Sequence, residues 1–260
     1  MRKVVGWMVF LWLAVLLSPS LLAARQLMVW AVVREEGGSD LFFSQEEENG
    51  WSEPECLFST PHLIRHPTVV GNREQMIWVA WQEVTPSQEF MWQRIRDRGR
   101  WQNQERLQLS AGGDEDPVLF VDSTDTVWLV WSGLEGNDRE IFAASWLGER
   151  WGERKRLSHN PAGPDKHPLV IRAADGGLLV SWSGFDGSLY RHRKARLVGT
   201  HWELERDGDE RKRQAYLSGL GKQSPVLPPA KLLGPVQLSL FSTATGIATP
   251  YVFNQKLSVQ

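Results

Sequence analysis

Tryptophan recurs along this chain at intervals of about 50 residues. One series is separated by 51, 50 and 51 residues and consists of Trp30, Trp81, Trp131 and Trp182. A second series is separated by 50, 50 and 51 residues and consists of Trp51, Trp101, Trp151 and Trp202. Proline and leucine keep the same register at Pro67, Pro117 and Pro168 and at Leu57, Leu107 and Leu157. Four sets of landmarks in one register indicate an internal repeat, and a period of this length is typical of solenoids and propellers.

Each repeat contains four short segments with the character of β-strands. The unit at 115–158 shows them at 116–121, 127–131, 140–145 and 151–157. These segments are rich in β-branched and aromatic residues, and the stretches between them carry the Gly, Asn, Asp and Ser of turns. No segment after residue 24 sustains the 3.6-residue apolar period of a helix. The sequence therefore predicts an all-β fold.

A repeat of about 50 residues with four antiparallel strands has the size of one β-propeller blade. The recurring tryptophans are then expected to fill the space between neighbouring blades. We predict a single β-propeller domain over residues 25–260, with repeat units at 27–60, 65–110, 115–158, 166–218 and 224–254. This pattern favours about five blades. Four blades plus a C-terminal hairpin, or a larger ring, are the alternatives.

The first 24 residues have the organisation of a secretory signal peptide. Arg2 and Lys3 precede an apolar run at 4–17, and small residues follow up to Ala24. The run is shorter than the roughly 20 residues that span a bilayer. We therefore expect an exported protein, periplasmic or secreted, with no membrane span in the mature chain. An uncleaved N-terminal membrane anchor is the alternative.

Charge and cysteine content narrow the functional classes. The chain has 29 Lys and Arg against 31 Asp and Glu, a formal net charge of −2, which is not the strongly basic balance of a nucleic-acid-binding protein. Cys56 is the single cysteine, so no disulfide forms within the chain. Because Cys56 lies in an apolar, strand-like run, we expect it to be a small buried side chain.

Polar residues stand directly before the repeated proline in three units. These residues are His66, Asp116 and His167, and they are expected to surround the central channel at one end. Two histidines and an aspartate there would bind a divalent metal or form a polar funnel for a ligand. The alternative is that each is held extended by the following proline and caps the start of its strand.

Other candidates for ligand binding come from the loops and from tryptophans outside the regular series. Arg65 neighbours His66, and Glu83 and Glu135 follow the second strand of their units. Trp92 and Trp146 lie off the repeat register. The predicted ligand-binding set is Arg65, His66, Glu83, Asp116, Glu135, His167, Trp92 and Trp146. We assign no catalytic residue, no metal ligand and no cofactor.

Two segments carry part of a known repeat motif. Residues 44–51 keep Ser44 and Trp51 with Glu46 between them, and residues 145–151 keep Ser145, Gly148 and Trp151. They resemble the Asp-box repeat of sialidase-like (BNR-type) β-propellers, whose pattern is Ser-x-Asp-x-Gly-x-Thr-Trp. The resemblance implies a six-bladed ring as a further alternative.

True sialidases use an arginine triad, a tyrosine–glutamate pair and an aspartate acid/base. Their early Arg-Ile-Pro signature is absent here, where Arg65, His66 and Pro67 stand at a comparable place. We therefore expect a non-catalytic propeller that binds or scaffolds, with a glycan or an envelope or extracellular protein as partner and no nucleic acid. The alternative is a sialidase-like glycoside hydrolase with a carboxylate-lined site at the channel mouth.

Overall fold

The computed structural model describes residues 26–205, except 111, 174 and 176, together with residues 236–242 and 246–253. In this part of the chain every regular element is a β-strand, so the all-β prediction is confirmed. No helix of the described residues is long and apolar enough to span a membrane. Three predicted segments lie outside the described residues: the signal peptide at 1–24, residues 206–218 of the fourth repeat unit and residues 224–235 of the fifth.

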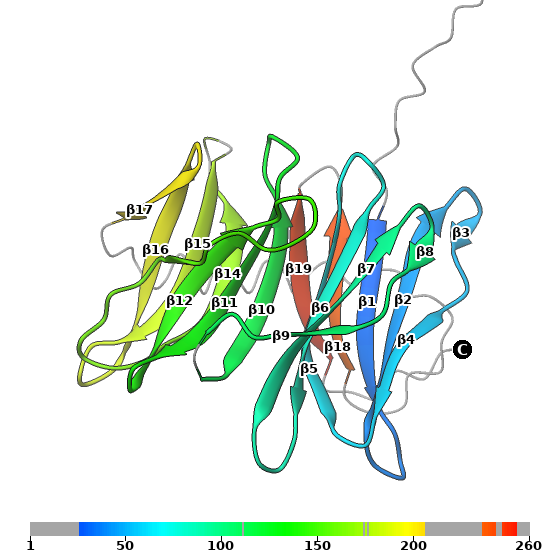
Figure 1. Ribbon diagram of the computed structural model, residues 1–260, viewed down its shortest axis with the longest axis horizontal. Coiled ribbons are helices and arrows are strands. Elements are labelled where there is room, and N and C mark those ends of the chain that lie inside the picture. The colour runs from blue at the N-terminus through cyan, green and yellow to red at the C-terminus, as the bar shows by residue number, and fades with distance from the viewer. Residues whose placement is uncertain are drawn as a thin grey trace, which may run out of the picture.

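The strands form antiparallel blades that follow the sequence repeat (Figure 1). The second blade contains β5 (Leu63–Gly71), β6 (Ile77–Val84), β7 (Glu89–Asp97), β8 (Arg100–Trp101) and β9 (Glu105–Leu107). The third contains β10 (Asp114–Val121), β11 (Val127–Glu135), β12 (Asp138–Ser145) and β13 (Lys155–Arg156). The fourth contains β14 (Asp165–Arg172), β15 (Leu178–Phe185), β16 (Tyr190–Val198) and β17 (His201–Glu205).

The first blade is assembled from both ends of the described chain. Its N-terminal strands are β1 (Gln26–Val33), β2 (Ser39–Glu47), β3 (Gly50–Trp51) and β4 (Glu55–Thr60). Its innermost strand is β18 (Val236–Ser242), which pairs antiparallel with β1 and continues into β19 (Ile247–Phe253). β19 touches the third blade through the single pair Phe120 and Ile247. The described strands of the predicted unit at 224–254 are therefore β18 and β19, and β18 belongs to the first blade. The number of blades stays a prediction.

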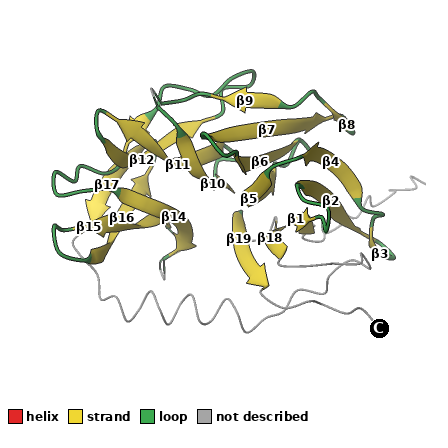
Figure 2. Cartoon of the chain, turned by 90° about the horizontal axis from the view of Figure 1, so that it is seen from below, coloured by secondary structure: helices red, strands yellow, loops and turns green. Residues whose placement is uncertain are grey.

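The blades fan out around their innermost strands. Figure 2 shows β14, β10 and β5 at the inner edge of an arc of sheets, with the hairpin β18–β19 beside them. The turns between the first two strands of a blade repeat as well. Asn72 donates its N–H to the Met76 carbonyl and Asp122 donates to Thr126, and both turns hold a positive φ at the fourth position, in Gln75 and Asp125. The second and third blades therefore have the same type of turn between their first two strands.

The two tryptophan series pack between blades, as the repeat predicts. Trp81, Trp131 and Trp182 of the inner series are fully buried within the hydrophobic clusters. In the outer series, Trp101 meets Phe43 of the preceding blade edge to face at 5.1 Å, and Trp202 meets Trp128 in the same way at 5.7 Å. Burying one such ring contributes several kcal/mol, about 4 to 6 by area, which makes these contacts a main stabilising term between blades.

Cys56 differs from its prediction, because its side chain is exposed. The pairing of β2 with β4 shifts register between Leu41 and Phe42, opposite Phe58 and Cys56. This irregularity lies on an edge strand and turns Cys56 outward, while Leu57 next to it is buried.

Candidate functional site

The innermost strands of the second, third and fourth blades share an irregularity at the residue before proline. His66, Asp116 and His167 have φ angles of 48°, 53° and 55°, in the left-handed region. The pairing with the next strand shifts register at the same place in each blade. The expectation of an extended residue was therefore wrong. Proline has no N–H to give to the ladder, and a bulge accommodates this by turning the residue before it out of the strand.

The bulges bring three side chains from three blades into contact. The Asp116 carboxylate lies between the two imidazoles, with Oδ1 at 3.2 Å from His66 Nε2 and Oδ2 at 3.0 Å from His167 Nδ1. The backbone N–H of His167 also donates to Asp116 Oδ2, at 3.2 Å. The Asp116 side chain is 8% exposed, while those of His66 and His167 are 41% and 63% exposed. A buried carboxylate thus orients two accessible imidazole rings.

The surroundings lower the pKa values of both Asp116 and His66, for different reasons. Burial favours the protonated form of Asp116, but the hydrogen bond from His167 and the proximity of both histidines outweigh it and lower the Asp116 pKa. Burial is the largest effect on His66 and lowers its pKa, and the nearby His167 and Arg65 act in the same direction. At neutral pH Asp116 is therefore ionised and His66 is mainly the neutral imidazole, able both to donate and to accept a hydrogen bond.

Polar groups of the second and third blades extend the site. Asp116 donates its backbone N–H to Gln82 Oε1 at 3.3 Å, and the Gln82 amide donates in turn to Glu89. Glu115 is paired with the Arg139 guanidinium. Burial and a hydrogen bond with Glu89 raise the pKa of Glu115 to about 7, against the lowering effect of Arg139. We call these residues the inner-strand cluster: His66, Gln82, Glu89, Glu115, Asp116, Arg139 and His167.

An exposed aromatic side chain lies at the same end of the fourth blade. Tyr190 is 51% exposed and opens β16 opposite Phe185, with ring centroids 5.3 Å apart. Tyr190 stands 51 residues after Arg139, which stands 50 residues after Glu89. Superposing the repeats would therefore have found Glu89 and Arg139, which the sequence prediction missed, because Glu89 is the first residue and Arg139 the second of the third strand in its blade.

The remaining predicted residues have other surroundings. Glu83 is buried and accepts hydrogen bonds from Thr60 and from Trp92 Nε1, the latter at 2.9 Å. Trp92 packs against Phe58 and Trp146 against Trp78 and Trp151, so both serve contacts between strands. Arg65 is exposed beside His66.

Glu135 belongs to a second polar group, between the third and fourth blades. It binds Arg154 at 3.0 Å and Arg156 at 2.7 Å, and Arg156 also pairs with the buried Glu140. Glu140 lies beside Asp165, and burial and this neighbour raise the pKa of Asp165 to about 6. The contacts of Glu135 are thus with this group and not with the inner-strand cluster.

The described side chains do not form a metal-binding site. No group of three or more His, Cys, Asp or Glu residues is arranged there to hold one. In the inner-strand cluster the two histidines face different oxygens of Asp116, so the carboxylate occupies the place between them. This arrangement suits hydrogen bonding to a ligand.

Comparison with known proteins finds similar solved structures at low sequence identity. No family model matches the sequence, and no curated protein matches it. Among solved structures, a protein of unknown function from Dyadobacter fermentans is similar at a TM-score of 0.47 and 12% identity, over 89% of this chain and 83% of that one. An endo-arabinase from Bacteroides thetaiotaomicron has a TM-score of 0.43 and 13% identity, over 88% and 94%. A Hadza microbial sialidase has a TM-score of 0.45 and 13% identity, over 83% and 54%.

The architecture defines the class. Four antiparallel blades, their innermost strands gathered in one arc, and aromatic packing between successive blades make this chain a multi-blade β-propeller.

Proposed function

We propose that this protein is an exported, non-catalytic β-propeller that binds carbohydrate at the inner-strand cluster. The observation that carries the proposal is the convergence of His66, Asp116 and His167 from three separate blades. Each of these residues has a left-handed backbone conformation, which costs about 1 to 2 kcal/mol for a residue with a side chain. Strain of this kind, repeated at one place, is characteristic of functional sites.

The chemistry of the cluster fits a ligand with several hydroxyl groups. A sugar hydroxyl donates one hydrogen bond and accepts others, so neighbouring hydroxyls are held best by acceptors and donors placed side by side. The carboxylate of Asp116 accepts, the Arg139 guanidinium donates, and the neutral imidazole of His66 does both. A few convergent polar groups of this kind are what orient a small ligand.

Tyr190 supplies an apolar surface beside the polar groups of the inner-strand cluster. Its ring is half exposed and is supported from behind by Phe185. An aromatic ring with one accessible face offers a large flat contact area to the C–H face of a sugar. We propose that Tyr190 takes this role at the rim of the site.

A matched pair of histidine variants tests the proposal. Asparagine tolerates the left-handed backbone, so H167N removes the imidazole and keeps the bulge. H201N is the control, because His201 is also 63% exposed but lies on β17. We expect a glycan array to identify a binding sugar, and calorimetry to show that H167N weakens its binding at least about tenfold, a loss of about 1.4 kcal/mol. Binding to no glycan, or equal weakening by H201N, would contradict the proposal.

A glycoside hydrolase is the second candidate, and one observation favours it. The neighbours Glu115 and Asp116 have pKa values moved in opposite directions, to about 7 for Glu115 and downward for Asp116. Glycoside hydrolysis uses one protonated and one ionised carboxyl group, placed on either side of the scissile bond. Release of reducing sugar from the array's binding glycan, lost in E115Q, would replace the binding proposal with this one.

Export is a separate part of the proposal. It rests on the pattern of charged, apolar and small residues at 1–24. N-terminal sequencing of the protein recovered outside the cytoplasm of a bacterial host is expected to begin close to residue 25. Recovery of the full-length chain from the membrane would instead support the uncleaved anchor.

A further inference from the structure

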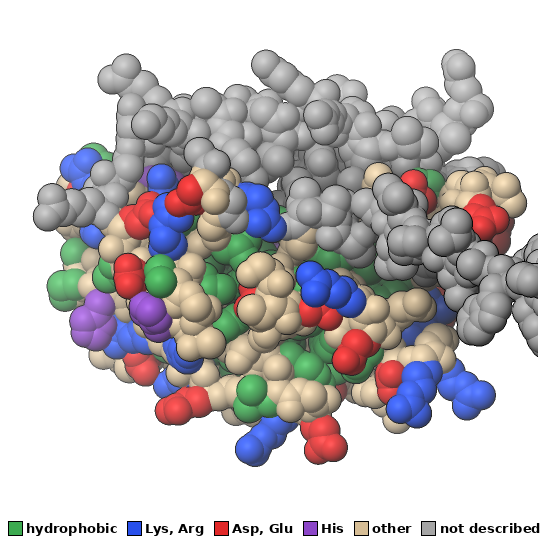
Figure 3. Space-filling model, turned by 90° about the horizontal axis from the view of Figure 1, so that it is seen from above, with side chains coloured by type: hydrophobic (Ala, Val, Ile, Leu, Met, Phe, Trp, Pro, Cys, Tyr) green, Lys and Arg blue, Asp and Glu red, His purple; other side chains and the backbone are tan. Residues whose placement is uncertain are grey.

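A pocket of about 630 Å³ lies at the end of the blades opposite to the inner-strand cluster. β5 contains His66 and ends at Gly71 in the pocket wall, so this strand runs from the inner-strand cluster to the pocket. The turn at 72–76, the turn at 122–125 and the β7–β8 hairpin form its rim, and the first two lie at the upper edge of Figure 1. Figure 3 shows this side of the molecule, where Lys and Arg side chains lie next to Asp and Glu side chains.

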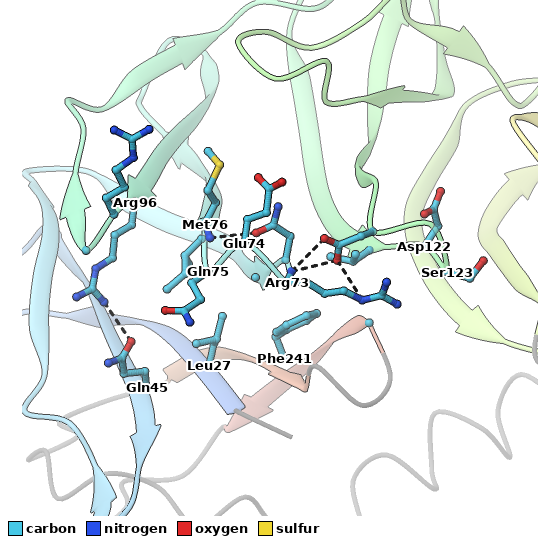
Figure 4. Close-up of a pocket in the computed structure, with 18 of the residues that line it drawn as sticks. Leu27, Gln45, Arg73, Glu74, Gln75, Met76, Arg96, Asp122, Ser123 and Phe241 are labelled. Atoms are coloured by element: carbon cyan, nitrogen blue, oxygen red, sulfur yellow. Dashed lines mark hydrogen bonds and ion pairs between the residues drawn. The ribbon is translucent and has the colours of Figure 1, made fainter. Parts of the chain in front are cut away.

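The inner wall of the pocket is apolar. Leu27 and Phe241 line it, and both are buried, as is Ile77. Met76 adds a flexible side chain from the rim (Figure 4). A volume of this size accommodates a hexose or a small oligosaccharide, and the apolar wall offers one face for a ring.

Arginines dominate the polar part of the lining. Four of them, Arg73, Arg96, Arg98 and Arg172, face three acids, Glu74, Asp122 and Asp125. Asp122 already accepts hydrogen bonds from Thr124, Thr126 and Trp128. Asp125 accepts two from the Arg73 backbone. Asp125 also pairs with the Arg73 guanidinium, whose Nε lies 4.0 Å from Oδ1. The four arginines of the lining outnumber its three acids by one.

Arg96 brings a guanidinium to the wall of the pocket. It donates from Nη1 to Gln45 Oε1 at 3.1 Å (Figure 4). Its guanidinium carbon lies 5.8 Å from the centre of the Trp101 ring. Its Nε is buried and has no hydrogen-bond partner among the described residues. A buried donor without an acceptor is uncommon in folded proteins and is satisfied when an acceptor arrives. Arg98 lies two residues further on; its side chain is 93% exposed and its Nε lies 4.0 Å from Asp97 Oδ1.

We infer that this pocket is a second binding site, and that it takes a sugar-sized anion. The ring of the ligand packs against Leu27 and Met76, and its carboxylate or phosphate group binds Arg96 and Arg98. Planar guanidinium groups pair with carboxylate and phosphate oxygens through two parallel hydrogen bonds, which makes arginine the side chain suited to either anion. The site is independent of the carbohydrate site proposed above, because none of the residues in the inner-strand cluster lines it.

Calorimetry with three probes of equal ring size tests the inference: glucuronate, glucose 6-phosphate and glucose. We expect at least one of the two anions to bind, with glucose binding at least about tenfold more weakly. Which anion binds distinguishes a carboxylate site from a phosphate site. Binding of glucose as tight as that of the anions would overturn the inference, as would the failure of both anions to bind.

Three arginine variants locate the binding. R96Q and R98Q are each expected to weaken binding of the anion about tenfold. R94Q is the matched control, since Arg94 lies on the same face of β7 and at the same 5.8 Å from the Trp101 ring, but outside the pocket. Arg98 is exposed, so R98Q keeps the test valid if R96Q does not fold. Equal weakening by R94Q would overturn the assignment. H167N is expected to bind the anion normally, which separates this site from the carbohydrate site.

Discussion

At the scale of the residue, the surroundings of a carboxyl group decide its role more than its place in the repeat does. Asp114 and Asp165 stand 51 residues apart and open the innermost strand of successive blades. Asp114 Oδ2 accepts the backbone N–H groups of Leu109 and Ser110, at 2.8 and 3.2 Å. Asp165 is fully buried beside Glu140, and its Oδ2 has no hydrogen-bond partner among the described residues.

This difference predicts opposite effects of the same substitution. Burial raises the pKa of Asp165 to about 6, so the folded state holds a proton that the unfolded chain releases near pH 4. The free energy of unfolding therefore falls as the pH rises from about 4 to about 6 and stays lower above that. We expect D165N to stabilise the protein at pH 8 by about 1 to 3 kcal/mol and to have little effect at pH 4, as measured by urea unfolding.

D114N is the control for this prediction. It removes the negative charge that accepts two backbone N–H groups, and we expect a loss of about 1 kcal/mol at pH 8. If D165N also destabilises the protein at pH 8, burial does not raise the pKa of Asp165 in the way described.

At the scale of the element, the β1–β2 hairpin packs closely against Thr60 at the end of β4. The β1–β2 turn has glycines with positive φ at Gly37 and Gly38. A side chain at Gly38 would collide with the Thr60 carbonyl and with Arg34, whereas one at Gly37 would meet nothing. Thr60 ends β4 and donates its hydroxyl to Glu83, so the hairpin also positions a buried carboxylate of the second blade.

Two alanine substitutions distinguish the cost of backbone strain at positive φ from the cost of a collision with Thr60. We expect G37A to cost about 1 kcal/mol, because alanine is strained at positive φ, and G38A to cost at least about twice as much, because the backbone of Thr60 has to move. Thermal unfolding followed by circular dichroism measures both. Equal costs would show that the close approach to Thr60 relaxes without penalty.

At the scale of the whole molecule, the first blade depends on a strand that is distant in the sequence. β18 pairs with β1 over seven residues, from Val32 with Val236 to Gln26 with Ser242. Phe241 of β18 is fully buried in the cluster that joins the first three blades. The C-terminal hairpin is therefore part of the core.

Truncating Phe241 tests this dependence. F241A is expected to destabilise the protein by about 3 to 5 kcal/mol, the usual cost of emptying a buried aromatic site. L204A is the control, because Leu204 is 64% exposed on the edge strand β17, and we expect a change below about 0.5 kcal/mol. A small effect of F241A in denaturant titrations would mean that the first blade is stable without β18.

The local signals of the sequence predicted most of the elements. Tryptophan spacing, turn residues and alternation located the strands of the first four units, and they identified the interblade role of Trp101 and Trp202. The same signals wrongly suggested that Cys56 is buried, because alternation does not reveal an irregularity on an edge strand. They also could not separate Trp92 from a ligand-facing tryptophan, since only packing against Phe58 shows its surroundings.

The sequence by itself determined the repeat, the all-β class and the placing of His66, Asp116 and His167 at equivalent positions. These features follow from spacing along the chain and from the preferences of single residues. Only the tertiary structure decided that the C-terminal hairpin completes the first blade, that the three bulge residues meet, and that Glu115 holds its proton near neutral pH. Such properties depend on pairing between strands about 200 residues apart and on burial beside particular neighbours, and no local pattern encodes either.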